Sequence, residues 1–170
     1  NVREIGLSGF EAEKLLRYRY RIQVELSDLY NILVAGAIGD SEESMNALVA
    51  AIEDFTQDHG RENVVKMMYD VPENQEMMVS PRLAFYSEKR VVPLEEAEGE
   101  ISAEMLMAYP PGIPIICPGE LITREVIDYI KTLNSEGCYL EGTEEPDAST
   151  IKVLANIESV KYFEQVKDVV

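Results

Sequence analysis

The sequence predicts a mixed α/β (α+β) protein of two small two-layer units, a β-α-β-β-α unit followed by a mixed α+β C-terminal domain. Three observations predict this class. Short β-branched runs alternate with amphipathic, helix-length stretches. Capping signals precede several of those stretches. A segment rich in Met and Pro, without periodicity, separates two patterned regions. The 170 residues are enough for a buried core in one ordinary domain or two small ones.

The first half of the first unit combines two expected strands with a helix. Residues 2–5 read as a short strand. Ser8 and Glu11 have the spacing of a capping box, in which each side chain reaches the other residue's backbone, so a helix should run from there to about Tyr20. Residues 22–25 alternate in polarity and predict the next strand.

The second half of that unit predicts a buried strand and a long helix. The apolar run 30–38 is typical of a strand buried on both faces. Residues 40–43 again have capping-box spacing and should begin the helix. Its expected buried stripe follows the helical period: Met45, Leu48, Val49, Ile52 and Phe55.

We place the first domain at 1–66, a linker at 67–80 and the second domain at 81–170, with a weakly amphipathic tail at 155–170. A helix should begin at Ser80-Pro81, where proline suits the first turn. A strand at 91–92 should follow.

The proline-rich run 109–120 predicts a rigid extended strand bounded by turns, because proline restricts both itself and its neighbour. Thr123 should cap a helix that ends near Asn134. Two strands, 138–140 and 151–154, complete the unit.

Composition and motifs exclude several functions. With 32 acidic against 15 basic residues, the formal charge of −17 disfavours nucleic acid and anionic membrane surfaces as partners. The chain lacks the glycine-rich fingerprints of dinucleotide and phosphate-loop sites. Its single His excludes His-pair metal sites, and we predict no metal. The two Cys have no metal spacing and indicate a reducing, cytoplasmic location. A start at Asn1, inside an expected strand, indicates a piece of a longer protein.

The proline-rich run also carries a family resemblance. Residues 108–114 (AYPPGIP), followed by 118–120 (PGE), resemble the C-terminal domain of the prokaryotic ornithine/lysine/arginine decarboxylases. The flanking segments agree: 81–86, 92–97, 99–104 and 151–153. Residues 24–31 (VELSDLYN) resemble the small-domain segment of the same enzymes. The resemblance covers about residues 2–154 and is closest to the shorter forms without an N-terminal response-regulator-like wing.

The resemblance implies a pyridoxal-phosphate-dependent enzyme with an aspartate-aminotransferase-like fold that converts arginine, lysine or ornithine to agmatine, cadaverine or putrescine. Such chemistry needs a lysine that forms a Schiff base with the cofactor. The family carries it in a Ser-x-His-Lys stretch of the large domain. Here the one His, His59, is followed by Gly60. The fragment should therefore hold no catalytic lysine, bind no cofactor covalently and be inactive alone. Its expected partners are that large domain, a basic amino acid and, in the full-length protein, further copies of itself.

The resemblance also indicates substrate-side residues. A basic substrate carries a distal cation, which is costly to desolvate unless a carboxylate meets it. Glu25 is the leading residue for that role, with Ser27, Asp28 and Tyr30 as neighbours in the pocket wall. Alternation alone favours a plain outward-facing Glu25. Glu120 is a weaker candidate, because a charge near the start of the 123–134 helix has a structural explanation in the helix dipole.

A second hypothesis is open. The β-α-β-β-α order also suits a ferredoxin-like regulatory module that binds an amino acid without catalysis. The proline-rich run distinguishes the two, because a simple regulatory domain has no need of it.

Overall fold

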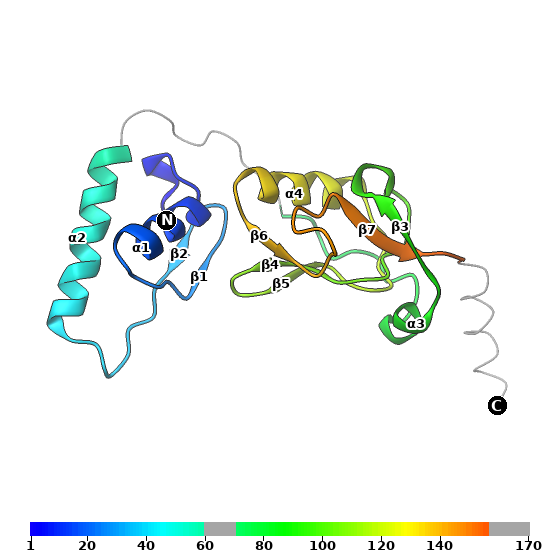
Figure 1. The fold of residues 1–170 in the computed structure, drawn as a ribbon, viewed down its shortest axis with the longest axis horizontal. Coiled ribbons are helices and arrows are strands. Elements are labelled where there is room, and N and C mark those ends of the chain that lie inside the picture. Colours follow the sequence, from blue (N-terminus) through cyan, green and yellow to red (C-terminus); the bar gives the residue numbers. More distant parts are fainter. Residues whose placement is uncertain (60–70, 157–170) are drawn as a thin grey trace. The chain divides into compact units, whose positions relative to one another are not determined.

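A computed structural model describes residues 1–59 and 71–156 (Figure 1). The chain divides into two units, Asn1–Met68 and Tyr69–Val170. Helices and antiparallel sheets occur in both, so the predicted mixed α+β class is confirmed. No helix in the described ranges is long and apolar enough to cross a membrane.

In the first unit, two helices accompany a short hairpin. The elements are η1 (Arg3–Ile5), α1 (Gly9–Arg19), β1 (Leu26–Ser27), β2 (Ile32–Leu33) and α2 (Glu42–His59). Strands β1 and β2 pair antiparallel, Leu26 with Leu33 and Ser27 with Ile32. Helix α1 begins with the predicted capping box between Ser8 and Glu11. The core of this unit collects around the fully buried Leu16 and Phe55.

Several expectations for this unit are wrong. Residues 2–5 contain a 3-10 helix instead of a strand, and 22–25 lie outside any strand. The run 30–38 is not buried on both faces: only Ile32–Leu33 pairs, and Leu33 is 51% exposed. The start of α2 is organised by reciprocal bonds between Ser41 and Ser44, in place of the expected box at 40–43.

The stripe predicted to be buried along α2 is split between two faces. Ala51 and Phe55 are buried and Leu48 packs against them. Met45, Val49 and Ile52 are 39%, 54% and 37% exposed. The helical period identifies apolar positions, but it does not say how wide the covered face is.

The second unit packs its longest helix on a three-stranded sheet. Its elements are α3 (Pro81–Tyr86), β3 (Lys89–Pro93), η2 (Leu94–Glu96), β4 (Leu106–Tyr109), β5 (Ile113–Ile116), α4 (Arg124–Ser135), β6 (Tyr139–Glu141) and β7 (Thr150–Leu154). One antiparallel sheet has the order β5-β4-β6 and the other pairs β3 with β7. Figure 1 shows α4 running along one side of the three-stranded sheet. The inward side chains of α4, as predicted, are at most 1% exposed: Val126, Ile127, Ile130 and Leu133.

The proline-rich run does not form one extended strand. Strand β4 ends at Tyr109, residues 110–112 form a turn and β5 begins at Ile113, so the run makes a hairpin. Gly112 closes the turn by donating its N–H to the Ala108 carbonyl, at a φ of +96°. Proline and a glycine with positive φ suit a tight turn at least as well as a strand, which explains the difference.

The second half of the segment expected to be a linker, 67–80, is built into the second unit. Met78 and Val79 both donate their N–H groups to the Gly119 carbonyl, and Val79 is buried. Residues 60–70 and the tail from 157 lie outside the described residues, so the start of the linker and the expected tail are not described.

Candidate functional site: the hairpin at residues 25–33

Glu25 stands where the chain enters the β1–β2 hairpin. Its N–H donates to the Leu33 carbonyl over 2.9 Å, so the backbone at this position is part of the hairpin. Its side chain is exposed, and its carboxylate has no hydrogen bond or ion pair to any other described residue. The hairpin therefore presents a negative charge that the described parts of the chain do not neutralise.

Ser27 follows two residues later, as the second residue of β1. It is 5% exposed. Its Oγ is the one buried side-chain oxygen or nitrogen within the described ranges that has no hydrogen-bond partner. A buried hydroxyl without a partner costs free energy, so it marks a place where another group would be favourable.

Asp28 is occupied by the turn itself. Its Oδ1 accepts from the N–H of Tyr30 at 2.7 Å and from the N–H of Asn31 at 2.8 Å, and the Asn31 amide group donates to both carboxylate oxygens. This is a turn closed by an Asp side chain on the backbone that follows it. In this geometry, Asp28 shapes the loop between β1 and β2.

Tyr30 is fastened to the start of the chain. Its carbonyl accepts from the N–H of Val2 over 2.8 Å, and the Arg3 guanidinium lies 5.4 Å from its ring centroid. The ring is half-buried. The guanidinium lies at the separation of a cation–π contact.

Gly9 brings helix α1 against the same turn. A Cβ at this position would lie 2.1 Å from the carbonyl oxygen of Asn31 and 2.2 Å from that of Asp28, so only glycine allows this approach. Its N–H donates to the Leu29 carbonyl. Sequence reasoning missed Gly9, Asn31 and Arg3 as supports of the hairpin. For Gly9, the sequence offered one signal of a close backbone approach, which is a glycine at the first position of a helix.

Glu120 has a local role in the second unit. Its Oε2 accepts from the N–H of Cys117 over 2.7 Å and closes the turn 117–120. Burial, followed by the nearby Glu120 charge, raises the pKa of the Cys117 thiol above its usual value. Helix α4 receives its cap from Thr123. Four of the five predicted residues thus belong to one hairpin, and Glu120 belongs to the other unit.

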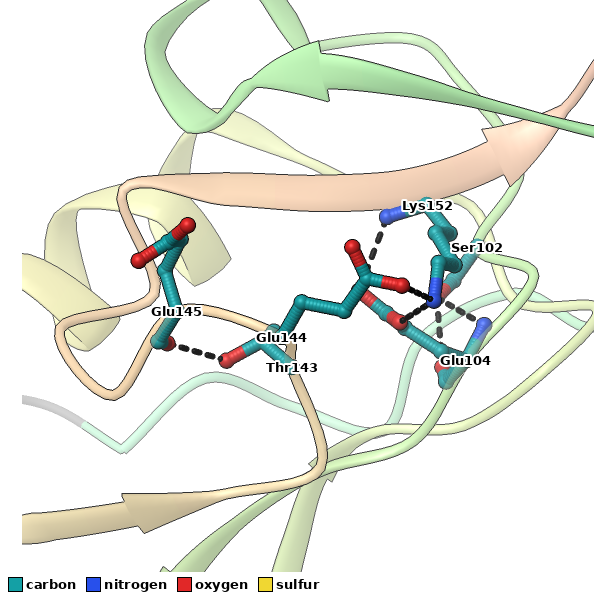
Figure 2. A network of polar contacts seen from close by, with 6 residues as sticks. All are labelled: Ser102, Glu104, Thr143, Glu144, Glu145 and Lys152. Carbon is teal, nitrogen blue, oxygen red and sulfur yellow. Dashed lines mark hydrogen bonds and ion pairs between the residues drawn. The ribbon is translucent and has the colours of Figure 1, made fainter.

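A polar network elsewhere in the second unit fastens the loop 142–149 (Figure 2). The Lys152 ammonium group bonds Glu144 at 2.5 Å and lies 3.9 Å from Glu104, whose other oxygen accepts the Lys152 N–H. The hydrogen bond to Glu144 is the main cause that raises the pKa of Lys152. The buried Ser102 donates to the Glu104 carbonyl. The bonds named here all join residues of the second unit, which fits a structural role for this network.

Over the ranges 1–59 and 71–156, no group of three or more His, Cys, Asp or Glu residues could hold a metal ion. The candidate site is the 25–33 hairpin of an α+β protein of two units. It combines a carboxylate that has no partner in the described part of the chain with a turn held by Asp28 and Gly9. Such an arrangement is suited to receive a cation.

Comparison with known proteins identifies the family to which this α+β chain belongs. Residues 62–145 match the family described as Orn/Lys/Arg decarboxylase, C-terminal domain. The arginine decarboxylase of Bacillus anthracis is 42% identical over 91% of this chain, which corresponds to 32% of that protein. That of Bacillus subtilis is 40% identical over 95% of the chain and 33% of the relative. The chain belongs to the Orn/Lys/Arg decarboxylase family and spans about a third of the length of these relatives.

Solved structures support the fold. A lysine decarboxylase from Francisella novicida superposes with a TM-score of 0.67 at 23% identity, over 87% of this chain and 28% of that one. The constitutive lysine decarboxylase of E. coli gives 0.65 at 22% identity over the same shares.

Proposed function

We propose that the chain is the C-terminal third of a pyridoxal-phosphate-dependent decarboxylase that converts arginine to agmatine and CO₂. In this role the Glu25 carboxylate pairs with the guanidinium at the far end of the substrate. Ser27, Asp28 and Tyr30 form the adjoining wall of the pocket, and Glu120 shapes its own turn.

The state of Glu25 is the observation that carries the proposal. A carboxylate that is exposed and has no partner in ranges 1–59 and 71–156 can accept a bidentate guanidinium without first breaking an interaction there. The backbone below it is fixed, by the bond to Leu33 and by Gly9 against the turn. Because this backbone is already held, only the side chain of Glu25 has to be ordered when a ligand binds, which favours affinity.

The neighbouring residues divide between positioning and contact. Asp28 acts by holding the turn, since its two oxygens already accept bonds from Tyr30 and Asn31. Ser27 is the neighbour with unused hydrogen-bonding capacity. A polar group of the substrate or of the large domain would satisfy it if the hairpin adjusts.

The cofactor belongs to the part of the enzyme upstream of this chain. Pyridoxal phosphate would supply the electron sink for loss of CO₂. The described lysines do not fit a Schiff-base role. Lys131 pairs with Glu95, Lys152 with Glu144, and Lys89 lies over the Phe85 ring. Lys14 is exposed on α1. We therefore assign this chain substrate recognition and no covalent step, and expect it to be inactive alone.

Arginine is favoured over lysine by the extent of the similarity. Relatives named arginine decarboxylase match over more than nine tenths of the chain at 40–42% identity. Relatives named lysine decarboxylase match 37% over about two fifths of it. The hairpin lies inside the share that the arginine enzymes cover.

The exposed face of α2 supports contact with the large domain. Met45, Val49 and Ile52 are spaced along one side of the helix and remain 37–54% exposed. Apolar groups at helical spacing on one face are typical of a packing surface. We therefore propose that the large domain covers this face. We also propose that the full-length enzyme is cytoplasmic and assembles as a homo-oligomer.

The test is a hybrid enzyme. The chain would replace the corresponding third of the Bacillus subtilis arginine decarboxylase, and agmatine release would be measured. We expect Glu25→Gln to lower kcat/KM for arginine by roughly 10- to 100-fold, because a hydrogen bond to a charged group is worth about 1.5–3 kcal/mol.

Glu53→Gln is the matched control, because Glu53 is an exposed carboxylate of the same unit without a partner in the described residues. It should leave kcat/KM unchanged. An active hybrid in which Glu25→Gln behaves like Glu53→Gln would contradict the proposed role.

The regulatory-module alternative has less support. A ferredoxin-like unit needs a four-stranded sheet, whereas the described part of the first unit pairs only Leu26–Ser27 with Ile32–Leu33. Calorimetry of the chain alone with arginine separates the two: tight stoichiometric binding would favour the module, and weak or no binding the decarboxylase.

A further inference from the structure

The connection between β2 and α2, residues 34–41, carries a large apolar side chain at its tip. Ile38 is fully exposed. A Cβ added at Gly36 or at Gly39 would meet no atom within 4 Å, so the tip stands clear of the other described residues. Figure 1 shows this connection extending beyond the near end of α2. Exposed turns favour glycine, proline and short polar residues, which makes an isoleucine at this tip unusual.

The turn that presents Ile38 is held by Asp40. The Asp40 N–H donates to the Ala37 carbonyl over 3.0 Å, and its Oδ2 accepts from the Ala37 N–H over 2.7 Å. The Ser44 hydroxyl, in the first turn of α2, lies 3.4 Å from the other Asp40 oxygen. At the start of the connection, Val34 packs against the core of the first unit. The Ile38 backbone is therefore already ordered, which lowers the entropic cost of binding through this side chain.

Ile38 belongs to a stretch in which the exposed apolar side chains of the first unit are concentrated. Within the described residues 1–59, every exposed large hydrophobic side chain except Tyr18 comes from residues 33–52: Leu33, Ile38, Met45, Val49 and Ile52. Exposed apolar groups gathered in this way are typical of an interaction surface. The stretch includes the face of α2 for which contact with the large domain is proposed above. The Ile38 turn thus continues that face along the chain.

The rest of the enzyme is the occupant that the observations favour. The chain corresponds to 32% of the Bacillus anthracis arginine decarboxylase, so most of such an enzyme lies outside this chain. Residues at the beginning of the chain are fastened to the hairpin: the Val2 N–H donates to the Tyr30 carbonyl over 2.8 Å, and the Asn1 amide donates to the Asn31 side chain over 2.9 Å. Only β2 separates that turn from residues 34–41. A large domain joined upstream would therefore be tethered near the Ile38 turn, and its high effective concentration favours it over a separate molecule.

We propose that Ile38 is an anchor that inserts into an apolar pocket of the large domain. Removing a fully exposed isoleucine from water is favourable, and a large side chain seated in a pocket is a common source of affinity between packed surfaces. The inference rests on the proposed function, because it takes the large domain as the partner. It adds the residue by which the first unit is held there.

The test is cysteine labelling of the hybrid enzyme and of the 170-residue chain alone. Ile38→Cys carries the probe, and Tyr18→Cys is the matched control, because Tyr18 is an exposed large side chain of the same unit outside residues 33–52. Reaction with a maleimide would be followed by mass spectrometry of the peptide that contains each site. We expect Ile38→Cys to react at least about 10-fold more slowly in the hybrid than in the chain alone, because a buried thiol is shielded from the reagent. Tyr18→Cys should react at similar rates in both.

A second measurement keeps the isoleucine in place, since cysteine is smaller and fills a pocket less well. Amide exchange of residues 35–39 in the unsubstituted hybrid should also be slower than in the chain alone. Circular dichroism would verify that the hybrid and its variants are folded.

Three outcomes would overturn the proposal. The first is labelling of Ile38→Cys and amide exchange of residues 35–39 at the same rates in the hybrid as in the chain alone. The second is slow labelling of Ile38→Cys already in the chain alone, which would make the second unit the occupant. The third is protection that disappears on dilution of the hybrid, which would make a second copy the occupant.

Agmatine release by the same hybrid separates this proposal from the proposed function. Protection of Ile38→Cys in a hybrid that releases no agmatine would support the anchor and contradict the decarboxylase role. An active hybrid without protection would overturn the anchor alone.

Discussion

Helices α2 and α4 show how differently the two units are completed. Both are amphipathic, and the apolar stripe of each includes isoleucine: Ile52 in α2, and Ile127 and Ile130 in α4. In α4 that stripe is covered by its own unit, and Ile130 is fully buried. In α2 only part of it is covered, and Ile52 is 37% exposed. The apolar stripe of α4 is covered within the second unit, whereas α2 of the first unit keeps apolar side chains exposed and Glu25 has no partner among the described residues. This difference is what we expect if the first unit faces the rest of an enzyme.

The largest expected effect comes from replacing one isoleucine in each helix, which tests the contrast between α4 and α2. We expect Ile130→Ala in α4 to lower the free energy of unfolding by about 2–5 kcal/mol, because it leaves a cavity in a packed core. Ile52→Ala in α2 should cost less than about 1 kcal/mol, since its side chain is partly in water. Urea unfolding followed by circular dichroism measures both. Similar losses at the two positions would contradict the contrast.

A second prediction concerns the turn that supports Glu25. Gly9→Ala would force a methyl group into the carbonyls of Asn31 and Asp28, and we expect it to cost about 1–3 kcal/mol and to displace the hairpin. Gly39→Ala is the control, because no atom lies within 4 Å of the added Cβ. Thermal unfolding would show the loss. In the hybrid enzyme, Gly9→Ala should also raise KM for arginine. If Gly9→Ala is as stable as Gly39→Ala, the hairpin is not held in the way described.

The smallest expected effect concerns the ion pair between Glu95 and Lys131 on the surface of the second unit. The hydrogen bond from Lys131, followed by its charge, lowers the pKa of Glu95. A lowered pKa in the folded state means that the pair stabilises the fold above the ordinary glutamate pKa. That contribution is lost as the pH falls through the lowered value.

We expect Lys131→Gln to raise the pKa of Glu95 toward its ordinary value, measured by an NMR titration of the side-chain carboxyl. Lys14→Gln, in the other unit, should leave it unchanged. An unaltered Glu95 titration in Lys131→Gln would show that the pair does not persist in solution.

Local signals predicted where α1, α3 and α4 begin, but not the strands of the first unit or the hairpin of the proline-rich run. The caps at Ser8, Ser80 and Thr123 are local, and each lies where the sequence predicts it. Residues 2–5 and 22–25 were wrong because short apolar runs do not distinguish strands from other extended or 3-10 segments. The covered width of α2 depends on what packs against it, which no local pattern contains.

The candidate site shows the same limit. The resemblance predicted the segment that carries Glu25, but only coordinates show that Asp28 is used by the turn and that Gly9 supports it. For Glu120, sequence reasoning foresaw a structural role through the helix dipole, whereas the carboxylate bonds the Cys117 N–H. Contacts between segments distant in sequence were not predictable from spacing.

Hydrogen exchange on the chain alone and within the hybrid enzyme tests the central contrast most directly. The account predicts that amides of the 25–33 hairpin and of α2 exchange more slowly once the large domain is present. Those of α4 and of the β3–β7 pair should keep their rates. Unchanged protection of the first unit, or an equal gain in both units, would contradict the claim that the first unit is the one completed by the rest of the enzyme.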